Sequence, residues 1–271
     1  MRKEDWEERA YGHRARIGLI VPANNNVIEP EFWKMAPEGV AFYATRLPVR
    51  GPVTDETFRR MEADADRAVE ELATARVQAL AFCDMGIALV MEAGWGERRV
   101  ARIREGSGLP ATTGALAMLD ALKALGVRRV ALATPYPESL HRRAGPFFER
   151  NGHPCAGDAN LPISDPADVG KVPPSRVYDL LKSADRPDAE ALLLLATDIR
   201  SIEALQALED ELRKPVLSTN ACLMWKVMRL TGVDAPIEGY GRLLSGKSEG
   251  PGIGGEGGER GEGPDADERP A

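Results

Sequence analysis

Short apolar runs alternate with longer stretches of mixed apolar and polar residues along most of the chain. The apolar runs predict β-strands at residues 16–21, 41–46, 77–82, 129–134, 191–195 and 215–218. Most of these runs are continuously apolar, which is typical of strands that are covered on both faces. Because strands that alternate with helices indicate parallel α/β units, the sequence predicts an α/β fold.

Three stretches between these runs predict helices. Residues 55–75 follow Thr54, a favourable N-cap, and they share an apolar face made of Phe58, Met61, Ala65, Ala68, Val69 and Leu72. Residues 116–125 end at Gly126, a common C-cap residue. Residues 201–212 end shortly before Pro215, which does not continue a helix.

Two segments lack such periodicity. Residues 161–174 are rich in Pro, Asp and Gly and predict a surface loop. Residues 247–271 contain almost no apolar side chains and many Gly, Glu and Pro residues. Such a segment cannot bury enough surface to become ordered, so we expect a disordered, acidic, Gly-rich tail outside the fold.

Net charge and hydropathy limit the kinds of partner. The 271 residues carry a formal charge of −7, with a pI near 5.2, so nothing favours nucleic acid or an acidic membrane. No apolar run approaches the roughly 20 residues of a membrane-spanning helix. The segment MRKEDWEERAYGHRAR lacks the apolar region of a secretory signal. These features predict a cytoplasmic protein without nucleic-acid or membrane partners.

The residues that bind metals or form disulfides are few and scattered. The chain has three cysteines, Cys83, Cys155 and Cys222. An odd number without close spacing implies no disulfide framework. The three histidines show no metal-ligand spacing, so we expect no bound metal.

The two halves of the chain echo each other. Each has a buried strand that runs into a small polar turn and then a helix, LAFCDMGIAL at 80–89 and LLLATDIRSIEAL at 193–205. Such a turn presents backbone N–H groups and the positive end of a helix dipole. Two such turns facing each other would form a cleft suited to a carboxylate, although turns of this kind are ordinary in α/β proteins.

Four motifs carry a family resemblance. GLIVPANNNVIEPE starts at Gly18, TTGALAMLDALKALGVRRVALATPY ends at Tyr136, and ATDIRSIEAL and STNACLMW follow in the second half. In this order the motifs resemble the aspartate/glutamate racemase superfamily, and within it the maleate isomerase and arylmalonate decarboxylase group. The first motif matches at Pro22, Asn25, Glu29 and Glu31.

The resemblance implies two pseudo-symmetric Rossmann-like lobes, each with a parallel sheet flanked by helices, and an active site in the cleft between them. The first lobe would comprise residues 14–118 and 216–246, and the second residues 119–215. Members of this group need no cofactor, and they use cysteines that face one another from the two strand-to-helix turns. A helix N-terminus can lower the pKa of such a thiol, so the resemblance implies a lowered pKa for a working cysteine.

The sequence departs from this pattern at the chemistry. The family cysteine of the second turn falls on Ala196. In the first turn an ungapped alignment places the cysteine on Asp84, and a shift by one residue places it on Cys83. A slip of one residue reverses the direction of a strand-end side chain, so both alternatives stay open.

The candidate catalytic residues are therefore Cys83, Asp84, Tyr136 and Asp198. Cys83 fits a nucleophile or a buried apolar residue, and Asp84 fits a general acid or base or a helix N-cap. Tyr136 fits a hydrogen-bond donor to a carboxylate or enolate, or a half-buried aromatic. Asp198 would replace the missing second thiol, or it would cap the helix that follows.

The candidate substrate-binding residues are Asn25, Thr197, Arg200 and Asn220. Asn25 would hold a carboxylate through its amide and Arg200 through an ion pair, and Asn220 would line the site from the first lobe. Each also fits a structural role: Asn25 as a turn residue, Thr197 as a helix cap and Arg200 in a surface ion pair.

The function that this resemblance implies is a cofactor-independent isomerase. The enzyme would act on a small carboxylate or dicarboxylate, in the manner of maleate isomerase, through an enolate-like intermediate. The resemblance is also compatible with a homodimer. An arylmalonate-type decarboxylase is one alternative. A non-catalytic carboxylate-binding homologue that has lost the second cysteine is the other.

Overall fold

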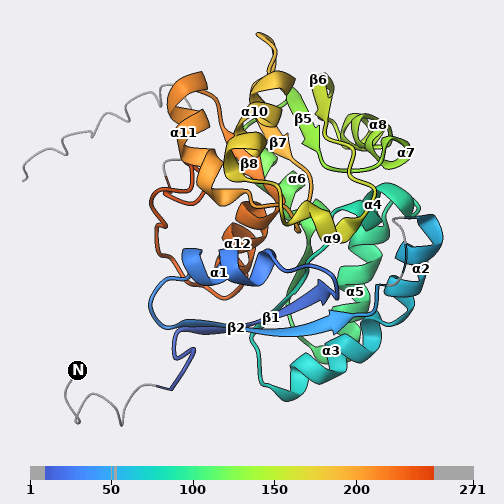
Figure 1. Cartoon of the computed structure of the whole chain (residues 1–271). Coiled ribbons are helices and arrows are strands. Elements are labelled where there is room, and N and C mark those ends of the chain that lie inside the picture. Colours follow the sequence, from blue (N-terminus) through green and yellow to red (C-terminus); the bar gives the residue numbers. More distant parts are fainter. Residues whose placement is uncertain (1–9, 50, 52–53, 247–271) are drawn as a thin grey trace, which may run out of the picture.

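Two four-stranded parallel sheets form the frame of the molecule (Figure 1). The computed structural model describes residues 10–49, 51 and 54–246. The strands of the first sheet are β1 (Ala15–Pro22), β2 (Val40–Leu47), β3 (Ala79–Phe82) and β4 (Ala111–Thr113), in the order β2-β1-β3-β4. Those of the second are β5 (Val130–Thr134), β6 (Cys155–Asn160), β7 (Ala191–Leu194) and β8 (Val216–Ser218), in the order β6-β5-β7-β8. The predicted α/β fold with two lobes is confirmed.

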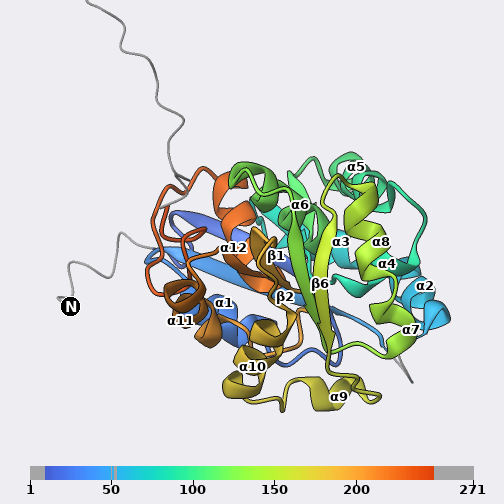
Figure 2. The same ribbon diagram turned by 90° about the horizontal axis from the view of Figure 1, so that it is seen from above.

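Helices flank both sheets. In the described residues they are α1 (Ile28–Met35), α2 (Asp55–Ala63), α3 (Ala65–Thr74), α4 (Gly86–Val90), α5 (Trp95–Ser107), α6 (Gly114–Ala124), α7 (Glu138–His141), α8 (Ala144–Arg150), α9 (Pro166–Val169), α10 (Pro174–Ala184), α11 (Ile202–Leu212) and α12 (Thr219–Leu230). Figure 1 shows α3 and α5 on one side of the first sheet and α1 on the other. Helices α10 and α11 pack on the second sheet, seen from above in Figure 2. Between the two lobes, α6 packs against α12.

The central strands explain where a site can form. Strands β1 and β3 are paired in parallel up to Ile20 and Phe82, and β5 and β7 up to Ala133 and Leu194. These strands are almost completely buried, as their continuous apolar sequences predict. In a parallel sheet the turns after neighbouring strands emerge at the same edge, which is where ligands of open α/β sheets bind.

Four assignments made from the sequence need correction. Strands β4 and β6 were not predicted, because the first has only three residues and the second is a half-buried edge strand with the mixed sequence CAGDAN. The helix predicted at 55–75 is two helices that meet at Asp64, whose backbone turns so that α3 packs on β1 and β2 while α2 contacts α4. The predicted loop at 161–174 contains the short helix α9.

The return to the first lobe comes slightly later than predicted. Strand β8, which begins at Val216, pairs with β7 and so belongs to the second sheet. Helix α12, which follows it, packs on α6, β3 and β4. The first crossing, predicted near residue 118, falls within α6. The predicted disordered tail, residues 247–271, lies outside the described residues.

Candidate active site

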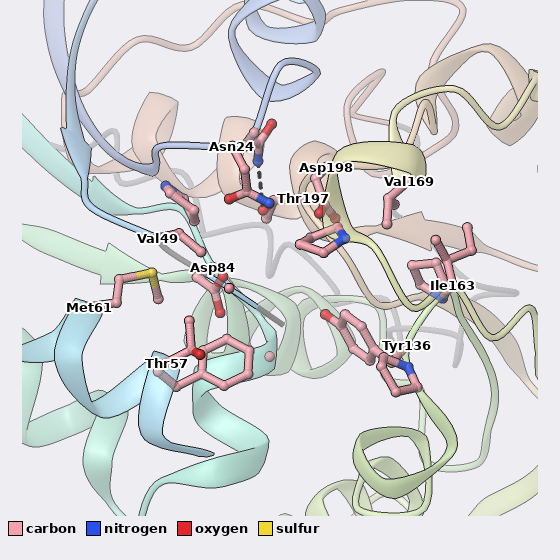
Figure 3. Close-up of a pocket in the computed structure, with 18 residues that line it drawn as sticks. Asn24, Val49, Thr57, Met61, Asp84, Tyr136, Ile163, Val169, Thr197 and Asp198 are labelled. Carbon is pink, nitrogen blue, oxygen red and sulfur yellow. Dashed lines mark hydrogen bonds between the residues drawn. The ribbon is translucent and has the colours of Figure 1, made fainter. Parts of the chain in front are cut away.

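A pocket lies between the lobes at the carboxyl ends of the strands. Turns after four strands contribute Pro22, Asn24 and Asn25, then Asp84 and Gly86, then Pro135, Tyr136 and Pro137, and finally Thr197 and Asp198 (Figure 3). Including the part that opens to solvent, the space measures about 670 Å³. Both predicted strand-to-helix turns therefore meet at one pocket.

Asp84 is the residue that the first turn presents to the pocket. It follows β3, and its Oδ1 accepts a hydrogen bond from the backbone N–H of Ile87, 2.7 Å away, in the first turn of α4. Burial raises the pKa of Asp84 to about 7, and the negative charge of Asp198 acts in the same direction. Asp84 therefore caps a helix, one of its two expected roles, and it also faces the pocket with a carboxyl group whose pKa lies near neutrality.

Cys83 points away from the pocket. Its side chain is fully buried, and its Sγ donates to the carbonyl oxygen of Ala81 at 3.3 Å. Burial, reinforced by the charge of Asp84, raises the pKa of the Cys83 thiol. The expectation of a lowered thiol pKa is wrong for Cys83, because its side chain lies in the core instead of at the N-terminus of α4. Cys83 fits its other interpretation, a small buried apolar residue.

The second turn presents Asp198. Ala196, at the position of the family cysteine, is buried, and the two residues that follow it line the pocket. Burial raises the pKa of Asp198 to about 6. Arg200 does not reach the pocket: it is exposed and forms an ion pair with Glu203 at 3.1 Å. The predicted carboxylate clamp by Arg200 is thus replaced by its alternative, a surface ion pair.

Tyr136 directs its hydroxyl toward the same space as the two carboxyl groups (Figure 3). Its backbone N–H contacts the hydroxyl of Thr134, 3.4 Å away, and that hydroxyl lies 3.0 Å from Nδ1 of the buried His141. Burial raises the pKa of Tyr136 well above its usual value, and Asp84 and Asp198 raise it further. Tyr136 therefore stays protonated and can donate a hydrogen bond to an oxygen of a bound molecule.

Asn25 and Thr197 join the two lobes beside the pocket. Asn25 Oδ1 accepts from the backbone N–H groups of Val27 and Ile28, both at 3.0 Å, so it fixes the start of α1. Its Nδ2 donates to Thr197 Oγ1 at 3.0 Å, the dashed line in Figure 3, and Thr197 Oγ1 donates to the carbonyl of Cys83 at 3.0 Å. An amide nitrogen has two hydrogens. Asn25 thus links the lobes through one N–H of its amide.

Asn220 does not line the pocket. Its side chain is fully buried at the start of α12, and Nδ2 donates to Glu31 Oε2 at 2.7 Å and to the carbonyl of Thr197 at 3.1 Å. The predicted direct contact with substrate is therefore not what the structure shows. Asn220 instead lies behind the second turn.

The apolar part of the pocket was not predicted from the sequence. It is formed by Val49, Phe58, Met61, Ile163, Pro166 and Val169. The last three belong to the segment predicted as a surface loop. This segment packs against the first lobe at Gly170, where an added Cβ would clash with Asn26 Oδ1. The apolar residues Ile163 and Val169 within a polar loop were the available signal.

The titratable side chains among the lining residues are Asp84, Tyr136 and Asp198. Within the residues that the structure describes, no cluster of histidine, cysteine or acidic side chains could hold a metal ion. None of the chain's three cysteines, all of which are described, is among the lining residues. Two carboxyl groups with pKa values near 6 and 7 and a protonated phenol suit proton transfer.

No helix in the described residues is long and apolar enough to cross a bilayer.

Comparisons with known proteins agree with this architecture. The chain is 29% identical to the maleate isomerase of Geobacillus stearothermophilus over 246 residues, which covers 86% of this chain and 98% of that protein. It is 31% identical to the arylmalonate decarboxylase of Bordetella bronchiseptica over 234 residues, which covers 84% of this chain and 95% of the relative.

Solved structures give the same relationship. A cysteine-to-alanine variant of the maleate isomerase of Pseudomonas putida S16, crystallised with maleate, superposes with a TM-score of 0.82 at 29% identity and covers 86% of this chain and 98% of that one. A cysteine-to-serine variant of the Nocardia farcinica maleate cis-trans isomerase carries a covalently bound succinylcysteine intermediate, and it superposes with a TM-score of 0.81 at 27% identity, covering 86% and 98%. The profile of the arylmalonate decarboxylase family matches residues 17–244. The chain belongs to the arylmalonate decarboxylase family.

Proposed function

We propose that this protein is a cofactor-independent isomerase of a small carboxylate that moves a proton through an enolate-like intermediate, with Asp84 and Asp198 as its acid and base. The observation that supports this most strongly is that the two strand-to-helix turns present aspartates, and no cysteine, to one pocket. The relatives with assigned activities are isomerases and a decarboxylase of small carboxylates. A cytoplasmic location and a homodimer stay predictions.

The proposed reaction uses the difference between the two acids. Asp198, with the lower pKa of about 6, is ionised first and removes a proton from the carbon next to the substrate carboxylate. The C–H electron pair moves into an enolate, whose oxygen accepts a hydrogen bond from the Tyr136 hydroxyl. Asp84, with the higher pKa of about 7, is the member of the pair that retains its proton longer as the pH rises, and it returns a proton to carbon. The proton that Asp198 gained then passes back to Asp84, which restores the pair.

A thiol adduct does not fit this pocket. The Nocardia relative holds a succinylcysteine intermediate, which requires a cysteine beside the substrate. In this chain Cys83 is turned into the core, and Ala196 has no thiol. The proposed isomerisation therefore proceeds by proton transfer and not by addition of sulfur to a double bond.

Decarboxylation is the second candidate, and the apolar wall favours it. A carboxylate held against Val49, Phe58 and Met61 would lose its hydration, and loss of CO₂ would relieve that cost. The resulting enolate needs one acid, Asp84, to protonate carbon. The 31% identity to the Bordetella decarboxylase supports this alternative.

A panel of small carboxylates in D₂O tests the proposal. Maleate, arylmalonates and chiral 2-substituted monocarboxylates would be incubated with the protein and followed by ¹H NMR and chiral chromatography. Proton-transfer isomerisation predicts deuterium at the carbon beside the carboxylate together with a changed configuration or double bond. Release of CO₂ would support the decarboxylase instead. Binding by calorimetry without turnover of any member would overturn both and leave the non-catalytic carboxylate-binding protein.

A further inference from the structure

Glu31 is a buried carboxylate that crosses from the first lobe to the second. It lies on α1 and is 3% exposed. Its two oxygens accept four hydrogen bonds, three of them from the start of α11 in the second lobe and one from α12: Ser201 N at 2.5 Å, Ser201 Oγ at 2.8 Å, Ile202 N at 3.2 Å and Asn220 Nδ2 at 2.7 Å. A buried carboxylate is costly unless it is fully hydrogen-bonded, and Glu31 meets that condition.

The first pair of bonds places Glu31 at the N-terminus of α11. Ser201 is the N-cap residue of this helix, but its own side chain makes no capping bond. Glu31 Oε1 takes the backbone N–H groups of Ser201 and Ile202 in its place. A negative charge is favourable there because the helix dipole is positive at its N-terminus. Helix α11 is therefore capped by the opposite lobe.

A second set of bonds, made by Asn220, reaches Thr197 at the beginning of the turn that leads into α11. Asn220 Nδ2 donates to Glu31 Oε2 and also to the carbonyl oxygen of Thr197, at 3.1 Å. The turn between Thr197 and Ser201 is thus held at both ends through one carboxylate. Asp198 lies between these two fixed points and faces the pocket with Asp84 and Tyr136.

From this geometry we infer that Glu31 is a positioning residue for Asp198: it fixes the turn at 197–201 across the lobes and so keeps the Asp198 carboxyl enclosed and aimed into the pocket. This inference rests on the proposed function for its catalytic consequence. The placement of Asp198 itself can be measured without turnover. Asp198 is half-buried, and loss of the Glu31 network exposes it further to water. The pKa of that carboxyl then falls toward its ordinary value, because burial is what raises it.

The test is the titration of Asp198 by NMR in the full-length protein with ¹³Cγ-labelled aspartate, the signal being assigned by its absence in Asp198→Asn. Glu31→Gln keeps the size of the side chain but loses two acceptor sites on one oxygen. We expect the midpoint of Asp198 to fall by about 1 pH unit and kcat to fall by about 10- to 100-fold with a smaller change in KM. Asn220→Ala breaks the link to Thr197 without changing charge and should move the midpoint in the same direction. Asn220→Ala also provides the test on its own if the Glu31→Gln variant does not fold.

Glu209→Gln is the matched control. Glu209 is also 3% exposed and accepts backbone bonds from Val216 and Arg242, but it lies at the other end of α11. Glu209→Gln should lower the free energy of unfolding, while the titration midpoint of Asp198 stays unchanged. An unchanged midpoint in both Glu31→Gln and Asn220→Ala would overturn the inference, and so would a shift in Glu31→Gln alone, which would reflect charge and not position. A shifted midpoint in a protein without any turnover would support the positioning role and refute the proposed function.

Discussion

The two strand-to-helix turns have similar positions in their lobes but different internal support. In the first turn Asp84 caps its own helix, because its Oδ1 takes the N–H of Ile87. In the second turn the first N–H groups of α11 bond to Glu31 of the opposite lobe instead of Asp198. The first turn is therefore complete within its lobe, whereas the second depends on the contact between lobes.

In the proposed mechanism, this difference gives the two aspartates different tasks. Asp84 is partly used in capping, yet burial and the nearby charge of Asp198 raise its pKa to about 7. Asp198 is released from capping, and its pKa reaches about 6. Two like charges in one buried site do not both ionise readily, so near neutrality the pair holds one proton. In the proposed mechanism, capping from the other lobe is what leaves Asp198 available as the base.

The largest expected effect is on turnover. Asp84→Asn keeps the capping oxygen, and Asp198→Asn keeps the shape of the second turn, but neither can transfer a proton. Each should lower kcat/KM by about 10²- to 10⁴-fold, the usual contribution of a general acid or base. The assay is steady-state turnover of the substrate that the panel identifies. Full activity in either variant would remove that aspartate from the mechanism.

The next effect concerns stability and pH. The pKa of Asp84 is raised in the folded protein, so its contribution to stability is present at low pH and is lost as the pH rises through about 7. Asp84→Asn has no such penalty. Its melting temperature should match that of the wild type near pH 4 and exceed it at pH 8. At pH 8 its free energy of unfolding should be higher by roughly 2 kcal/mol. Asp210→Asn, at an exposed position on α11, should follow the wild type throughout, and equal curves for all three would refute the raised pKa.

A smaller effect should follow from breaking the bond between lobes beside the pocket. Thr197→Val preserves shape but removes the hydroxyl that accepts from Asn25 and donates to Cys83. The buried amide and carbonyl would lose a partner, at a cost of about 1–3 kcal/mol in urea-induced unfolding. Thr231→Val is the control, since its hydroxyl bonds only within α12. Equal losses in the two variants would argue against a special role for the bridge.

The smallest expected effect is at Cys83. Cys83→Ala should keep kcat/KM within about twofold, because the side chain lies in the core, and it should cost about 1–2 kcal/mol of stability through a small cavity. Iodoacetamide should modify the half-buried Cys155 before Cys83 or Cys222. Mass spectrometry of the alkylated peptides gives the order. Fast, ligand-protected alkylation of Cys83 would restore the thiol mechanism.

Much of the fold could be predicted because its signals are local. The apolar runs of β1, β3, β5 and β7 and the periodicity of α6 and α11 correspond to buried strands and amphipathic helices. The short β4 and the mixed β6 carry no such signal, since their pairing partners decide that they are strands. The break at Asp64 depends on where α3 finds the sheet, and no local pattern records that.

The site was predictable in its location but not in its details. The two turns, Tyr136 and Asn25 were correctly expected at one cleft. The choice between Cys83 and Asp84 depends on the backbone direction at one strand end, which a one-residue slip reverses. Asn220 and Glu31 are adjacent only because α1 and α12 pack together, so their bond could not be read along the chain.

The pH dependence of kcat/KM tests the central claim most directly. An ionised Asp198 and a protonated Asp84 predict a narrow bell that rises with a pKa of about 6 and falls with a pKa of about 7. The two limbs of this pH profile report the coupled carboxyl groups of Asp84 and Asp198. Both limbs should therefore change when either aspartate becomes asparagine, and neither should change in Cys83→Ala. A single limb above pH 8 that disappears in Cys83→Ala would contradict the account.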